Sequence, residues 1–115
     1  MRGHLTDLET SNRLGAVGVQ QPSKFYHVFN QPCVDGKPPI KTRKEIDELL
    51  RVSTEVEFIP AYLLTELLEM VEGDWELDYD TGYYCLRYNS GNNYTAATKI
   101  IIQAVAEVII WQRGQ

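Results

Sequence analysis

The chain has 115 residues, of which 43% are hydrophobic and 23% charged, and a formal net charge of −5 at pH 7. These values are typical of one globular domain and argue against disorder of the whole chain. The acidic balance argues against direct binding of nucleic acid or of an anionic membrane, because both need a basic surface. The longest apolar stretch, 100–111, is too short and too polar for a membrane span.

Cysteine and histidine usage predicts neither a disulfide framework nor a metal site. Cys33 and Cys85 lie far apart, and no pair among them, His4 and His27 has a short metal-ligand spacing. The N-terminus has no apolar segment of the signal-peptide kind. We therefore expect a cytoplasmic protein with reduced thiols, no metal and no cofactor.

Residues 1–22 are expected to form a partly ordered N-terminal arm. Thr6 to Glu9 fits a capping box, and Gly15 can end a short helix. The apolar content of this segment is thin, and a short helix is marginal without a docking partner. A single domain is expected to follow over 23–115.

The next segments predict one strand and two short helices. Residues 24–29 are rich in aromatic and β-branched side chains, which favours a strand. Thr42 and Glu45 form a capping box at the start of a helix over 43–51. Pro60 fits the first turn of a second helix over 60–71, and residues 56–58 are compatible with a short strand before it.

Residues 75–88 predict an antiparallel hairpin. Apolar and polar side chains alternate on both sides of Asp80-Thr81-Gly82, which predicts two strands with one buried face. Arg87 shares the exposed face with the acids and can pair with one of them. The expected core face consists of Trp75, Leu77, Tyr79, Tyr84, Leu86 and Tyr88. The expected exposed face includes Glu76, Asp78, Asp80, Tyr83 and Arg87.

The C-terminal segment predicts an apolar helix over 94–112. Its polar side chains form a single row of Thr95, Lys99, Gln103 and Glu107. A helix that is apolar on nearly all sides must be covered on nearly all sides. We expect a chain of this size to leave part of it uncovered, and therefore predict a homo-oligomer through Ile100–Trp111.

Together these elements predict an α+β fold. A small antiparallel sheet, built from the strand 24–29 and the hairpin 75–88, would be packed by the helix 94–112 and by the two shorter helices 43–51 and 60–71.

The charge distribution is uneven along the chain. Residues 1–51 carry eight basic and six acidic side chains, whereas residues 52–115 carry three basic and ten acidic ones. Nine of those acids fall between Val52 and Leu86, where there is no lysine or arginine. A field of one sign steers partners of the other sign, so the acidic half predicts a basic partner.

No catalytic signature is present, so the sequence favours a non-enzymatic interaction protein of the inhibitor or adaptor type. It would bind a basic protein surface, for example that of a nucleic-acid-handling protein. Its carboxylates would then imitate the phosphates of the nucleic acid. Tyrosine is favoured at such interfaces. The residues expected to make this contact are Glu76, Asp78, Asp80 and Tyr83.

The alternative is a small-molecule or nucleotide-binding module. A polar, Gly-containing loop over 89–95 would open the last helix, where free backbone N–H groups can hold a phosphate. No phosphate-binding motif of the P-loop or dinucleotide kind accompanies it. The loop residues expected at that site are Ser90, Gly91, Asn92, Asn93, Tyr94 and Thr95.

Overall fold

The computed structural model describes residues 4–53, 55–88 and 94–114. Within these ranges the chain forms four helices and two three-stranded antiparallel sheets, which confirms the α+β class. The strand orders are β2-β1-β3 and β4-β5-β6. In chain order the elements are α1 (Leu8–Ala16), β1 (Phe25–Phe29), β2 (Ile40–Thr42), α2 (Arg43–Leu50), β3 (Glu57–Ala61), α3 (Leu64–Leu68), β4 (Trp75–Asp80), β5 (Tyr83–Tyr88), β6 (Tyr94–Thr98) and α4 (Ile101–Arg113).

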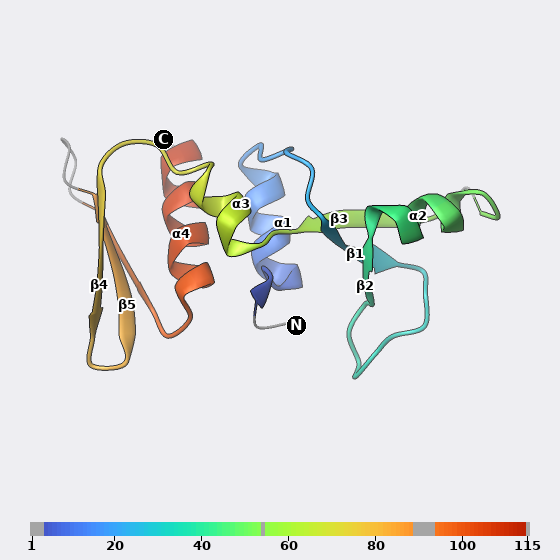
Figure 1. Cartoon of the computed structure of the whole chain (residues 1–115), viewed down its shortest axis with the longest axis horizontal. Helices are drawn as coiled ribbons and strands as arrows, with labels where there is room; N and C mark the ends of the chain where they lie inside the picture. The colour runs from blue at the N-terminus through green and yellow to red at the C-terminus, as the bar shows by residue number, and fades with distance from the viewer. Residues whose placement is uncertain (1–3, 54, 89–93, 115) are drawn as a thin grey trace.

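The molecule is elongated, with extents of 50 × 28 × 18 Å. The β4–β5 hairpin lies at one end, followed by α4, then by α3 and α1, and the other sheet lies with α2 at the far end (Figure 1). The two sheets are therefore separated by a layer of helices.

The predicted strand 24–29 is confirmed as β1, but its predicted pairing is wrong. β1 pairs with β2 and β3, not with the hairpin. The short strand expected at 56–58 is present as β3 and extends through Pro60 to Ala61. Because β3 is an edge strand, the missing N–H of Pro60 is tolerated there.

The helix predicted over 60–71 is shorter than expected. Only α3, Leu64–Leu68, is helical, because the residues before it belong to β3. The Glu66 carboxylate accepts hydrogen bonds from the N–H of Leu63 at 2.8 Å and from the hydroxyl of Ser23 at 2.7 Å. The first bond satisfies a backbone donor at the start of α3, and the second ties the helix to the residues just before β1. The other short helix is confirmed as α2, with the expected capping box of Thr42 and Glu45.

The helix predicted over 94–112 begins at Ile101, so the prediction was wrong for residues 94–100. Residues 94–98 form β6, which pairs along its whole length with β5. A strand partner is a long-range condition that overrides the helix propensity of Ala96 and Ala97.

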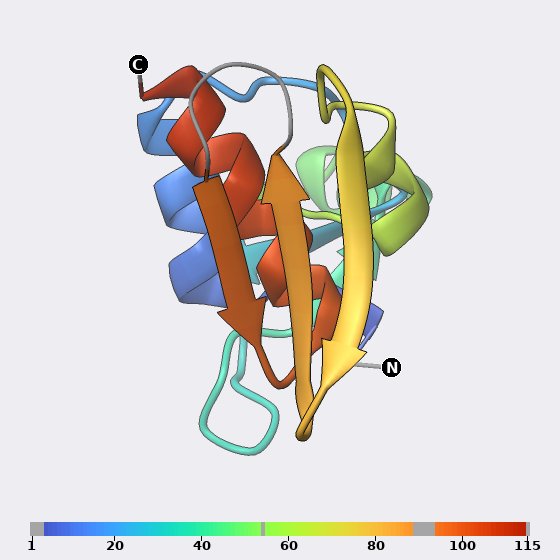
Figure 2. The same ribbon diagram turned by 90° about the vertical axis from the view of Figure 1, so that its left-hand side faces the viewer.

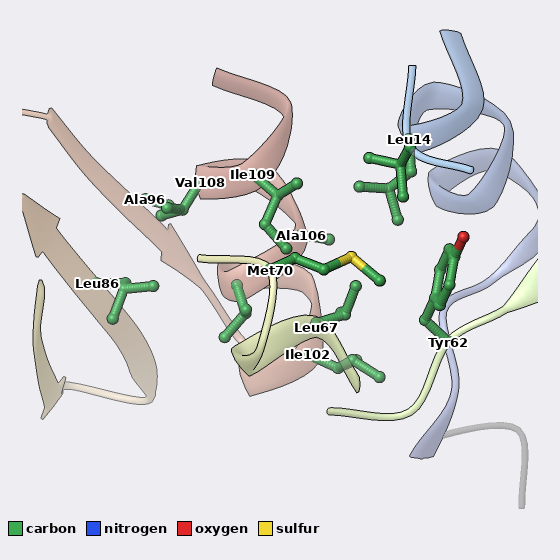
Figure 3. Packing of buried hydrophobic residues seen from close by; sticks show 12 residues of the cluster. Leu14, Tyr62, Leu67, Met70, Leu86, Ala96, Ile102, Ala106, Val108 and Ile109 are labelled. Carbon is green, nitrogen blue, oxygen red and sulfur yellow. The ribbon is translucent and has the colours of Figure 1, made fainter. Parts of the chain in front are cut away.

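α4 is the centre of the larger core. The sheet β4-β5-β6 covers one side of this helix, and α1 and α3 cover the opposite side (Figures 2 and 3). Its buried residues are Ile102, Ala104, Val105, Ala106, Val108 and Ile109. Most of this helix is therefore covered within one chain, which weakens the reason given for self-association. Ile100, which precedes the helix, is the large apolar residue of this segment that stays exposed, at 54%.

The segment expected to be an arm contributes α1 to this core. Leu14 is fully buried, and Val19 is also part of the cluster. The Asp7 carboxylate accepts from the N–H of Thr10 at 2.8 Å and begins the helix. Arg13 holds Glu107 of α4 through two hydrogen bonds. The structure thus gives this segment a place in the fold that its composition did not indicate.

A smaller core lies at the other end of the molecule, between α2 and the sheet β2-β1-β3. It contains Tyr26, Val28, Ile46 and Val56. The rings of Tyr26 and Phe58 meet edge to face at 5.4 Å between centroids. This end of the molecule therefore has a hydrophobic cluster of its own, separate from the core around α4.

Candidate protein-binding site

The β4–β5 hairpin forms where the alternating sequence predicted it. Its strands are joined by Thr81 and Gly82, with φ of 52° and 85°. Positive φ at both residues is characteristic of the two-residue hairpin turn whose backbone twist matches that of the paired strands. The register places Glu76 opposite Arg87, Asp78 opposite Cys85 and Asp80 opposite Tyr83, so the predicted acidic residues share one face.

We call this face, formed by Glu76, Asp78, Asp80, Tyr83 and Arg87, the outer face. Arg87 Nη1 donates a hydrogen bond to Asp78 Oδ2 at 2.8 Å, as the sequence suggested. Both side chains are nearly half exposed, and such pairs contribute about 0–1 kcal/mol. Tyr83 is 42% exposed.

The outer face is less negative than the sequence suggests. The Nζ atom of Lys99 lies 5.9 Å from the centroid of the Tyr83 ring, so a second cation joins Arg87 there. The acids of the 52–86 stretch are also dispersed, since Glu57 lies in β3, in the sheet at the other end of the molecule. The candidate site is therefore a row of carboxylates with cations beside it and not a uniform acidic patch.

The inner face of β4 differs from the prediction. Leu77 and Tyr79 were expected in the core, but they are 47% and 66% exposed. The reason is that α4 lies behind β5 and β6, and β4 extends beyond it (Figure 2). The half-buried residue of this face is Trp75, whose ring meets that of Trp111 edge to face at 6.4 Å. The Trp75 Nε1–H donates to the carbonyl oxygen of Glu72 at 2.6 Å.

The alternative ligand site loses its structural basis. Ser90, Gly91, Asn92 and Asn93 lie outside the described residues, and Tyr94 and Thr95 belong to β6. The segment therefore connects two antiparallel strands and does not open a helix. α4 begins at Ile101, so the free N–H groups of its first turn do not come from Tyr94 or Thr95.

A groove of about 830 Å³ lies between the first turns of α1 and the loop before β2. It was not predicted, because residues that are distant in the sequence form it. His27 in its wall is buried, with Nε2 2.8 Å from the carbonyl oxygen of Thr6. Residues that line the groove include Glu9, Asn12, His27, Lys37, Pro38 and Ile40.

The remaining candidate chemistry is sparse. Cys33 is exposed and Cys85 half-buried, and both are free thiols. Across residues 4–53, 55–88 and 94–114, no three His, Cys, Asp or Glu side chains are grouped to hold a metal ion. None of the helices described above has the length and apolar character needed to cross a membrane.

Comparison with known proteins gives no match to any family model, curated protein or solved structure.

Proposed function

We propose that this protein acts by stoichiometric binding, as an inhibitor or adaptor without enzymatic chemistry, and that its partner presents a basic surface. The outer face of the β4–β5 hairpin makes the contact. The observation that carries the proposal is the row of Glu76, Asp78 and Asp80 on one exposed strand, next to the exposed ring of Tyr83.

The physical roles of these residues differ. Exposed carboxylates mainly raise the association rate with a basic surface, and this effect weakens with salt over a Debye length of about 10 Å at 0.1 M. An aromatic ring that becomes buried on binding mainly slows dissociation. The pair of Arg87 and Asp78 must exchange partners or remain in place, so the gain per carboxylate is smaller than for isolated acids.

Homo-oligomerisation and a cytoplasmic location remain predictions. A self-interface within 100–111 has few apolar side chains to use, because the central residues of α4 are buried inside the chain. Ile100 is the exposed exception. Light scattering at high micromolar concentration measures the oligomeric state directly.

The test compares two triple variants with the same net charge. In the first, Glu76→Gln, Asp78→Asn and Asp80→Asn neutralise the outer face. In the control, Glu48→Gln, Glu55→Gln and Glu69→Gln remove three exposed carboxylates from other parts of the chain. Both variants and the wild type are used as bait in a pull-down, and the partner's association rate is measured against salt.

The proposal predicts that the outer-face variant binds more slowly and with a weaker salt dependence, whereas the control binds as the wild type does. Equal slowing by both variants would mean that net charge alone matters. A partner that binds both variants and the wild type at the same rate, at all salt concentrations, would refute an electrostatic role of the hairpin.

A second candidate function is small-molecule binding in the groove beside α1. Its volume of about 830 Å³ lies within the range of ligand pockets, and polar side chains such as Asn12 and Lys37 line it. A panel of nucleotides and amino acids, tested by thermal shift and by NMR, checks this. Amide shifts at Asn12 and Lys37 would favour it, and no shift at millimolar ligand would exclude it for that panel.

A further inference from the structure

We infer that the free edge of β4 receives an extended segment of the basic partner as an added strand. This inference rests on the proposed function and specifies how the partner is held. Among the described residues, β4 pairs with β5 alone and is therefore an edge of its sheet. Unpaired N–H and C=O groups along such an edge are a template for another strand.

The turn determines which backbone groups face outward. In a two-residue turn the flanking residues, here Asp80 and Tyr83, are joined by a hydrogen bond. Hydrogen-bonded and non-bonded pairs then alternate along an antiparallel ladder. Tyr79 and Leu77 are therefore in non-bonded positions, and their N–H and C=O groups point away from β5 to the open edge.

The two faces of β4 specify the chemistry of the incoming strand. Leu77 and Tyr79 are exposed on the inner face, where α4 does not reach. Glu76, Asp78 and Asp80 alternate with them on the outer face. A strand beside β4 would place its own side chains next to both rows, and opposite charges or apolar groups in neighbouring positions are stabilising. The complementary segment alternates Lys or Arg with apolar residues.

A second copy of this chain is a poor occupant of the same edge. Pairing β4 with β4 places the acids of the two copies beside each other on the outer face, and like charges in that position are destabilising. Edge strands also carry charges to prevent pairing altogether. In that competing explanation, no segment would add to β4, whatever its sequence.

The test uses a defined probe, a ten-residue peptide in which lysine and valine alternate. The controls are a peptide of the same composition with the lysines in one block, and an alternating peptide of glutamate and valine. NMR hydrogen exchange is measured on the full chain. Binding at the edge should slow exchange of the Leu77 and Tyr79 amides, and should leave that of Glu76 and Asp78, which already face β5, little changed.

A pair of variants at one position isolates the backbone donor. Leu77→Ala and Leu77→Pro both remove the leucine side chain, but only proline removes the N–H. Proline is tolerated on an edge strand where that N–H faces solvent. We expect L77P to weaken binding of the alternating peptide by about tenfold or more relative to L77A. If L77P does not fold, the exchange pattern of the wild type still decides.

The outcomes separate this inference from the proposed function. In one outcome, the peptide changes NMR chemical shifts only on the outer face, near Arg87 and Thr95, and does not slow amide exchange at Leu77 and Tyr79. This result would overturn strand addition but would still support a basic partner on the hairpin. Equal binding of the block peptide, or a concentration-dependent dimer that pairs at the edge, would also overturn it. If no basic probe binds and the outer-face variant retains the natural partner, both proposals fail.

Discussion

Leu14→Ala tests whether the N-terminal segment is part of the fold. Leu14 lies on α1, has 0% exposure, and packs into the cluster around α4 (Figure 3). The change removes three carbon atoms, each worth about 0.8 kcal/mol when buried. The cavity left behind adds to this loss of about 2.4 kcal/mol, so we expect the free energy of unfolding to fall by about 3 kcal/mol.

Guanidinium unfolding followed by the fluorescence of Trp75 and Trp111 measures this loss. Leu68→Ala is the matched control, because Leu68 is 52% exposed on the short helix α3. We expect it to cost less than about 1 kcal/mol. If Leu14→Ala costs no more than Leu68→Ala at an unchanged denaturant slope, α1 is not docked and residues 1–22 are an arm after all.

Three further predictions concern single side chains. Hydrogen bonds from Arg13 hold the pKa of Glu107 below its usual 4.5. The contribution of Glu107 to stability is therefore full above pH 4.5 and is lost as the pH falls through the lowered pKa. Glu107→Gln should remove this part of the acid dependence of stability, which denaturation at a series of pH values measures. Burial raises the pKa of Tyr62 from 10 to about 12. The stability that the neutral Tyr62 side chain contributes is full below pH 10 and is lost as the pH rises through about 12. The absorbance of tyrosinate should follow this titration. Tyr62→Phe should remove this pH dependence, at a cost of about 1 kcal/mol for the lost hydrogen bond to the Gln21 carbonyl. Tyr83→Ala should leave the melting temperature nearly unchanged, because the ring is exposed, and should speed dissociation of the partner in surface plasmon resonance.

The elements that the sequence predicted well are those with local determinants. α2 has its capping box within four residues, Thr42 to Glu45. The β4–β5 hairpin has its alternation and its Thr81-Gly82 turn within one stretch. In both cases the groups that stabilise the element are neighbours in the chain, so a single sequence is enough to identify them.

The elements that were mispredicted depend on distant partners. Pro60 can begin a helix or lie in an edge strand, and the pairing of β3 with β1 decides between them. Residues 94–98 are compatible with helix or strand until β5 is beside them. The groove next to α1 combines residues from α1, β1 and the loop before β2, so no local pattern points to it.

The candidate site was half predictable for the same reason. Alternation alone determines that Glu76, Asp78 and Asp80 share a face. Whether the opposite face is buried depends on how far α4 reaches across the sheet, and that is a property of packing. The two cations of the outer face differ in the same way. Arg87, beside Asp78, lies in the hairpin and could be predicted, whereas Lys99, beside the Tyr83 ring, comes from outside the hairpin and could not.

The position of β4 in the fold also bears on its use as a docking element. Its ring contact with α4, through Trp75 and Trp111, lies at one end of the strand, whereas Leu77 and Tyr79 are exposed nearer the turn. Segments with few buried contacts open at low cost, and binding elements are drawn from them. A partner strand that covered these two side chains would supply apolar burial that the chain itself does not, while the larger core around α4 stays unchanged. Binding at β4 should therefore protect the hairpin locally before it changes the global stability.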